Sequence, residues 1–367
     1  MNIHEVLKFC QCVFCKVKCL RFALMKNRFL ILLAIGGLFT SCSTKFNVGA
    51  EYKEVSVVYG LLSVSDTAHY IKITKGYFDE NQNNLALALN TDSLYFKNLQ
   101  VSMVILDNGN PIETLTLNRV DLTDEGYPKA TGVFGTLPNY AYKFKRNLDA
   151  TKTFRLKIKN LDTGKEIEAE SPLITNAPKF FQFVKPIDDQ ETLDFSSTTT
   201  PFVFRWKGPS TAAFYDVVIE FRYQELDMNT MDTSYVTVDV PIAKSILSGS
   251  GEISTSVKST DFFKQLNSFV SAAPDNIKRY VDTPGLKILG GGSVLKTYID
   301  VNTVQGGITA DQIKPNYTNM KGENVFGIFS TRGQIGMPLI KFNTATIESI
   351  KNGAFTQNLN FVGISTK

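Results

Sequence analysis

The residues best suited to chemistry in this chain are its five cysteines, and all of them lie within the first 42 positions. Thiols grouped in this way can hold zinc or an iron–sulfur cluster. The group consists of Cys10, Cys12, Cys15 and Cys19. The fifth, Cys42, stands apart, directly after an apolar run and a few small polar residues, which is the pattern of a cysteine that becomes lipidated. The surrounding sequence decides between a metal site and a membrane anchor.

The residues before Cys42 predict a bacterial lipoprotein signal. Lys26 and Arg28 precede the apolar run Phe29–Phe39, and small polar residues separate this run from the cysteine. A transmembrane helix needs about 20 apolar residues, so the run is too short to cross a bilayer. Cleavage would leave Cys42 as a lipidated N-terminus, and more than one acyl chain gives stable membrane attachment.

Residues 1–24 are interpreted as an upstream extension or an unusually long start of the signal, because Met25 opens a complete signal by itself. Cleavage would remove the four clustered cysteines, so we expect no metal site there. It would also remove six basic side chains and one acidic side chain. The mature chain then has 33 basic and 34 acidic side chains, and its formal charge falls from +4 to −1. That balance gives no support for a nucleic-acid partner.

The mature chain offers few groups for catalysis. Its one histidine is His69, and it has no thiol except the lipidated one, so neither a Ser-His-Asp nor a Cys-His site is indicated. His69 shares strand parity with Ile71 and Ile73, which favours a histidine at the edge of a core over a general base. Zinc would have to rely on carboxylates. We therefore expect no enzyme and no cofactor.

Oxygen ligands deserve a separate test, because Asp79–Asn83 begins like a calcium loop. The pattern then fails, with Asn84 in place of the glycine and Asn90 in place of the bidentate glutamate. A second polar group, Asp227, Asn229 and Asp232, is interpreted as the tip of a hairpin.

Two further motifs are interpreted as structural. The glycines at 290–292 precede 293–300, which is predicted to be a strand, so the helix that a phosphate loop needs is not expected. Asp188–Glu191 is the densest acidic group and favours a solvated loop between domains. A pair of carboxylates for glycoside hydrolysis stays open, since the fold sets its spacing.

Alternating apolar and polar residues predict a mainly β fold. This alternation places one face of a strand in a core and the other in water. It occurs at 154–159, 217–222 and 236–240, and turn signals lie at 107–110, 124–126 and 162–164. Many short strands separated by turns favour β-sandwiches. The predicted parts are a signal peptide over 1–41, a lipidated tether over 42–50, an N-terminal β-sandwich domain over 51–175 and a C-terminal β-sandwich domain over 178–367.

The second domain opens with a strand that carries Phe202, Phe204 and Trp206 on one face. A proline turn follows, and then a strand with Tyr215, Val217 and Ile219. These 25 or so residues resemble the B and C strands of fibronectin type III domains. A helix near 260–273 is also predicted, with Ser259 or Thr260 as its cap and Pro274 at its end. The apolar stripe that predicts it consists of Phe262, Leu266, Phe269 and Val270.

The whole mature chain resembles an uncharacterised family of outer-membrane lipoproteins from Bacteroidota. The segments that carry the resemblance are Val57–Leu62, His69–Ile73, Asp92–Leu99 and Gly322–Ser330, together with the Thr-Ser-Cys ending of the signal. The resemblance implies β-rich domains on the cell envelope and an outer-membrane protein partner, since members are thought to accompany TonB-dependent transporters. It identifies no catalytic or ligand residues.

Two function classes follow. The first is a non-catalytic outer-membrane lipoprotein that serves as an accessory or binding component of an envelope assembly, and the alternative is a surface carbohydrate-binding protein or a glycan-processing enzyme that uses carboxylates. Exposed Tyr or Trp beside a cleft would favour the alternative, whereas an exposed apolar patch would favour the first. Ser43–Phe46 holds no acidic residue, and by resemblance this favours the periplasmic face of the outer membrane over the cell surface.

Overall fold

The computed structural model describes residues 55–76, 89–132, 135–184, 192–249, 251–303 and 317–365. Over these residues the fold is mainly β, as predicted, and its strands form sheets of ten, four and three strands. Cys42, the signal and the tether lie outside the described residues, as do the start of the predicted calcium loop, Asp79–Asn84, and the acidic group Asp188–Glu191.

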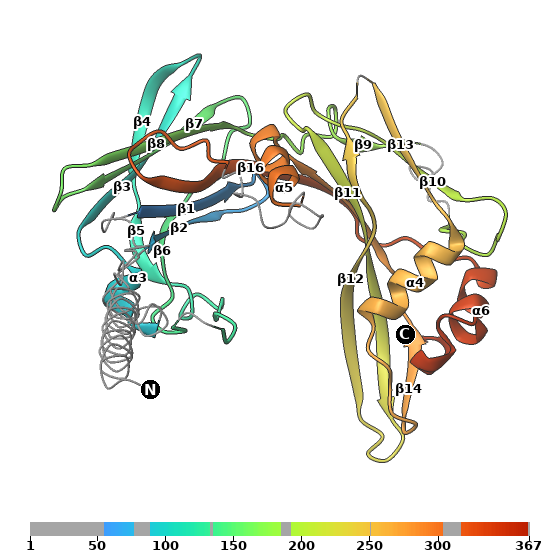
Figure 1. The fold of residues 1–367 in the computed structure, drawn as a ribbon. Helices are drawn as coiled ribbons and strands as arrows, with labels where there is room; N and C mark the ends of the chain where they lie inside the picture. The colour runs from blue at the N-terminus through green and yellow to red at the C-terminus, as the bar shows by residue number, and fades with distance from the viewer. Residues whose placement is uncertain are drawn as a thin grey trace, which may run out of the picture. The chain divides into compact units, whose positions relative to one another are not determined.

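The first β-sandwich packs the four-stranded sheet against one end of the ten-stranded sheet (Figure 1). The four-stranded sheet has the order β4-β3-β7-β8, with β3 at Leu99–Asp107, β4 at Asn110–Thr116, β7 at Thr153–Asn160 and β8 at Glu166–Pro172. The facing strands are β1 at Val55–Leu62, β2 at Ala68–Gly76, β5 at Asn118–Asp121 and β6 at Tyr140–Lys145, and a short helix, α3, covers Thr91–Leu94.

Strand alternation explains this first core. In β7, Phe154, Leu156 and Ile158 are buried, while Arg155 points outward and forms an ion pair with Glu170 on β8. The predicted turns are also present. At 107–110, Asn108 and Gly109 adopt φ angles of 48° and 83°, and two such left-handed residues are what a tight two-residue hairpin requires.

The second β-sandwich packs the three-stranded sheet β13-β10-β9 against the other end of the large sheet. The small sheet consists of β9 at Gln182–Phe183, β10 at Phe202–Lys207 and β13 at Glu252–Val257. The facing strands are β11 at Phe214–Asp227, β12 at Thr233–Leu247, β14 at Ile277–Val281, β15 at Gly285–Gly291 and β17 at Phe361–Ile364. Three helical segments complete it, namely α4 at Ser259–Phe269, α6 at Thr344–Asn352 and the 3-10 turn η3 at Gln357–Leu359.

The predicted centre of the second core is confirmed. Trp206 and Tyr215 are both 0% exposed, and their rings meet edge to face with centroids 5.5 Å apart. Arg205 faces outward and pairs with Glu252 on β13, and Lys207 is exposed. Period-two alternation therefore places the only tryptophan inside and its charged neighbours in water.

Helix α4 confirms the predicted helix, but its ends differ from the prediction. Phe262 is fully buried and stacks on Phe195 with ring centroids 4.1 Å apart. The residue at the N-cap is Lys258, whose side chain forms no capping hydrogen bond, so the predicted Ser259 or Thr260 cap is wrong. The helix stops at Phe269 because Val270 is already extended, several residues before Pro274.

The strand predicted over 293–300 is wrong, because these residues lie in helix α5 at Ser293–Thr303. Leu295, Tyr298 and Ile299 recur at helical spacing, and all three line one hollow together with Tyr59 and Leu61 of β1. An ion pair of 2.6 Å between Lys296 and Asp300, one turn apart, supports the helix on its other side.

Strand β16, at Val325–Met337, belongs to both sandwiches. Its first half pairs in parallel with β1, and its second half pairs antiparallel with β15. Gly327 permits the first pairing, since its φ is 98° and a Cβ there would lie 1.9 Å from the carbonyl oxygen of Val58. A strand from the predicted C-terminal domain, 178–367, thus pairs with a strand of the first sandwich. The predicted domain boundaries assign β16 to the second sandwich alone.

Candidate functional site

A groove lies on the outward face of the large sheet, on the side of β1 that faces away from the first core. Along β1, Val58 and Leu62 are fully buried, whereas Tyr59 and Leu61 are exposed by 42% and 39%. Two adjoining hollows of about 440 Å³ and about 640 Å³ form the groove. Both hollows are lined by Asp66, Ala68, Tyr70 and Arg332. We call this feature the tyrosine groove, after Tyr59, Tyr70, Tyr127 and Tyr298.

One end of the tyrosine groove is formed by Tyr59 of β1 and Tyr298 of α5. The two hydroxyl oxygens lie 3.0 Å apart, within hydrogen-bond distance, and the rings meet edge to face with centroids 6.1 Å apart. Burial and the hydroxyl of Tyr298 raise the pKa of Tyr59 to about 12, so this phenol stays protonated over the physiological range. The contact holds α5 against the sheet while leaving much of the Tyr59 ring in solvent.

The other end is formed by Tyr70 of β2 and Tyr127. Their ring centroids are 5.6 Å apart in an edge-to-face arrangement, and Tyr127 is 58% exposed. The Tyr70 hydroxyl donates a 3.0 Å hydrogen bond to Glu125, which also forms an ion pair with Lys143. The hydrogen bonds from Lys143 and Tyr70 lower the pKa of the Glu125 carboxyl, so this carboxyl stays ionised.

The charges that line the tyrosine groove cancel. Asp66 and Arg332 are its acidic and basic lining residues, and their side chains meet at 3.0 Å. The other lining residue that could carry a charge near neutral pH is His69. Burial lowers its pKa, so it is neutral at pH 7. The groove is therefore amphipathic but carries no net charge.

His69 takes the position at the edge of the core that the sequence predicts. It is 2% exposed and lies on the same face of β2 as Ile71 and Ile73. Its Nε2 donates a 2.9 Å hydrogen bond to the carbonyl oxygen of Arg146, and its ring packs on Phe144 with centroids 4.8 Å apart. Nδ1 has no hydrogen-bond partner in the part of the chain that the structure describes. This environment favours the neutral ring.

Lys72 is a half-buried titratable group on β2. Desolvation lowers its pKa to about 8, with a smaller effect from the charge of Lys129 in the same direction. Its Nζ donates hydrogen bonds to the hydroxyl of Tyr95 and the side-chain oxygen of Asn139, and it lies over the Tyr95 ring at 5.1 Å. These contacts explain why it is half-buried, and it does not line the tyrosine groove.

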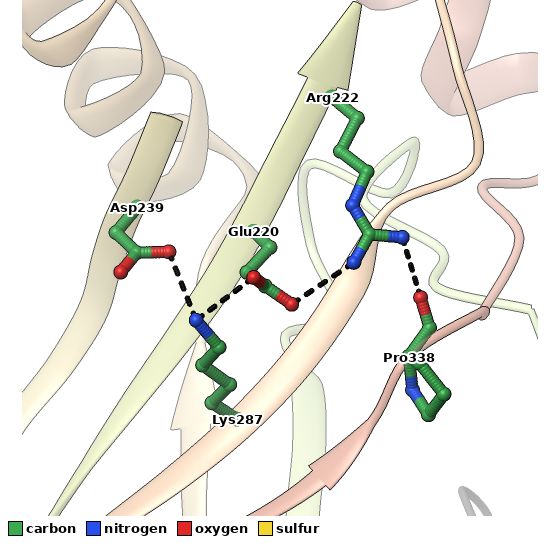
Figure 2. Close-up of polar contacts among 5 residues, drawn as sticks. All are labelled: Glu220, Arg222, Asp239, Lys287 and Pro338. Atoms are coloured by element: carbon green, nitrogen blue, oxygen red, sulfur yellow. Dashed lines mark hydrogen bonds and ion pairs between the residues drawn. The ribbon is translucent and has the colours of Figure 1, made fainter. Parts of the chain in front are cut away.

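A third polar group lies on the second sandwich. Figure 2 shows Lys287 of β15 between the carboxylates of Glu220 and Asp239, at 2.8 Å and 3.5 Å. Arg222 donates to Glu220 at 3.1 Å and to the carbonyl oxygen of Pro338 at 2.6 Å. Burial opposes the charge of Lys287, but its two carboxylate partners raise its pKa overall. Each charge here is paired, so the cluster is interpreted as a brace between strands.

The remaining predicted polar motifs have local roles. Asp227, Asn229 and Asp232 lie at the β11–β12 hairpin tip, as predicted, where the Asp227 carboxylate accepts hydrogen bonds from the Asn229 backbone and the Asn276 side chain. The glycines at 290–292 do precede a helix, contrary to the prediction. The backbone N–H groups of Ala213 and Lys296 donate hydrogen bonds to the carbonyl oxygens of Gly291 and Gly292. No contact among the described residues indicates a phosphate ligand at these glycines.

The sequence interpretation did not identify the tyrosine groove, although β1 contained a signal for it. This strand carries apolar residues on both faces, with Val58 and Leu62 on one and Tyr59 and Leu61 on the other. A strand at the surface of a sandwich would show polar residues on one face. Apolar residues on both faces indicate that another element of the fold or a ligand contacts the outward face of β1.

Comparisons with known proteins add no family: no family model matches the chain, and no curated protein sequence matches it either. Within the described ranges, no three residues among His, Cys, Asp and Glu come together as a metal site would require. In the same ranges, no helix has the length and hydropathy to span a membrane.

Proposed function

We propose that this protein is a non-catalytic lipoprotein of the bacterial outer membrane that binds a ligand or an envelope partner through the tyrosine groove. Cys42 would carry the lipid, and the periplasmic face is the favoured location. The observation that supports the binding role is the groove itself, an apolar and aromatic hollow open to solvent on a sheet face that β-sandwiches normally fill with polar residues. Such surfaces mark interaction sites, and the exposed tyrosines beside the hollows favour the carbohydrate-binding form of this role.

The groove supports binding better than catalysis. Asp66 is committed to Arg332, and His69 lies with its ring in the core. An acid or base that acts on a substrate must reach it within hydrogen-bond distance. Neither group is arranged in that way, whereas the rings of Tyr59 and Tyr127 are open to contact.

Membrane attachment can be tested by fractionation of cells that express the wild type or Cys42→Ala. The wild type should be found with the outer membrane and should be labelled by a palmitate analogue, and Cys42→Ala should lose both properties. Unlabelled wild-type protein in the soluble periplasmic fraction would contradict the anchor. Protease added to intact cells should leave the protein whole, and digestion would instead place it on the cell surface.

The binding role can be tested by pull-down of the lipidated protein from outer membranes. We expect a co-purifying outer-membrane component with the wild type and with Tyr235→Ala, a control with an exposed tyrosine on β12. Tyr59→Ala combined with Tyr127→Ala should lose it. If the groove variant captures the component as well as the wild type does, the component binds another face of the protein. A TonB-dependent transporter that contacts such a face would give this result.

A further inference from the structure

We infer that the ligand of the tyrosine groove is a neutral glycan chain. This inference rests on the proposed binding function and specifies its ligand class. Three properties of the groove carry it: the type of its exposed rings, the cancellation of its charges, and the union of two hollows of different polarity.

The exposed rings are all phenols. A tyrosine offers an apolar face together with a hydroxyl at its rim, and the face carries negative charge density that attracts the C–H groups of a partner. A pyranose ring has the matching arrangement, with C–H groups on its faces and hydroxyls at its edge. Tyr59 and Tyr127 are exposed by 42% and 58%. Tyr59 meets Tyr298 edge to face, and Tyr127 meets Tyr70 in the same way, so the two rings of a pair do not cover each other's faces by stacking.

The charges of the groove select against an ionic ligand. Asp66 and Arg332 neutralise each other at 3.0 Å, and Glu125 at the far end is neutralised by Lys143. A phosphorylated or uronic sugar would need an unpaired cation, because a charge taken from water must be compensated. The Asp66–Arg332 pair still offers acceptors and donors side by side, and these are the groups that hold sugar hydroxyls.

The two hollows differ in polarity along the groove. The first is lined mainly by apolar and aromatic side chains, including Leu61, Leu295 and Ile299. The second adds the polar side chains of Ser65 and Thr67 to the Asp66–Arg332 pair that both hollows share. A lipid chain would need an apolar lining along the whole length. Volumes of about 440 Å³ and about 640 Å³ are each of the size of a small-molecule site. Their union fits a ligand of several repeating amphipathic units.

The experiment is isothermal titration of the purified protein with neutral linear hexasaccharides of α-linked glucose, β-linked glucose, mannose, xylose and galactose. An oligogalacturonate, myristate and an unstructured peptide of alternating polar and apolar residues serve as comparisons. We expect one or more neutral hexasaccharides to bind and the three comparisons not to bind. Tyr59→Ala and Tyr127→Ala should each weaken the affinity about tenfold, the loss expected when one stacking ring is removed. Tyr235→Ala, with 59% exposure close to that of Tyr127, should leave it unchanged.

Absence of binding by every neutral hexasaccharide at millimolar concentration would overturn the inference, and so would equal affinity in the groove variants. Binding of myristate or of the peptide alone would assign the groove to a lipid or a protein. The proposed function fails separately. If no saccharide binds but the groove variants lose a co-purifying envelope protein, the binding role stands and the glycan assignment falls. If the wild type is soluble and unlabelled, the lipoprotein proposal falls whatever the titration shows.

Discussion

The aromatic residues of this protein occupy two contrasting settings, the core of the second sandwich and the tyrosine groove. In the core, Phe195, Phe204, Trp206 and Phe262 are at most 1% exposed and contact other rings on several sides. In the groove, Tyr59 and Tyr127 keep about half of their surface in water. Each set includes a ring carried by a strand, Trp206 on β10 and Tyr59 on β1, but only the first set is covered by a second layer.

This difference separates stability from recognition. A buried ring contributes through the apolar area that folding removes from water and through close packing. An exposed ring has contributed little of either, so its surface is still available for a ligand. We therefore expect substitutions in the core to unfold the protein, and substitutions in the groove to change binding alone.

The largest effect is expected for Trp206→Ala. Trp206 is 0% exposed and packs against Tyr215, and truncation of a large buried aromatic costs about 3 to 5 kcal/mol because it leaves a cavity. Urea unfolding of the purified protein should show this loss. Trp206→Phe is the matched control and should cost less, since it keeps a ring and removes an indole N–H that has no partner among the described residues. Wild-type stability in Trp206→Ala would contradict the proposed core.

A smaller, pH-dependent effect is expected for His69. Burial lowers its pKa in the folded state below the unfolded value of about 6.5. Its stabilising contribution is therefore complete above that value and is lost as the pH falls through the folded pKa, because the unfolded state binds the proton more readily. The melting temperature should fall as the pH drops below about 6.5, before the carboxylates titrate near about pH 4.

The control for this effect is His69→Phe, which keeps a ring against Phe144 but cannot be protonated. It should be less stable than the wild type at neutral pH, because the carbonyl of Arg146 loses its donor. Its melting temperature should change little across the same pH range. A wild-type profile as flat as that of the variant would show that His69 does not sense pH.

The smallest effect is expected for Lys287→Met. Lys287 joins Glu220 and Asp239 on the outside of the second sandwich, and Glu220 keeps Arg222 as a partner after the substitution (Figure 2). Ion pairs near the surface contribute about 0 to 1 kcal/mol, and salt screens them. Urea unfolding at low and high salt should show a loss within that range that shrinks with salt. A loss comparable to that of Trp206→Ala would make the cluster part of the core.

Sequence patterns predicted the elements whose own periodicity shows one buried face. The alternation in 154–159 and 217–222 predicted strands because each has one face in a core. The same logic placed Trp206 inside. Helix α4 was predictable from its apolar stripe, since a helix against one core shows a single period.

Elements that depend on distant contacts were not predictable in this way. Helix α5 follows three glycines and contains β-branched residues, which favour a strand. Its apolar residues face the outward side of β1, and this distant contact is what explains their helical spacing. The parallel pairing of β16 with β1 joins residues at opposite ends of the chain, which no local pattern encodes. The tyrosine groove needs both, so no local pattern in the sequence identified it.

The measurement that tests the account most directly is urea unfolding of the wild type and of Tyr59→Ala combined with Tyr127→Ala, each with and without the hexasaccharide that binds. Without saccharide, the two proteins should differ by no more than about 1 kcal/mol, as expected for exposed positions. Saccharide at a hundred times its Kd should stabilise the wild type by about 2.7 kcal/mol and the variant much less. A variant that is destabilised like Trp206→Ala, or that gains as much from the saccharide as the wild type, would contradict the separation of binding from folding.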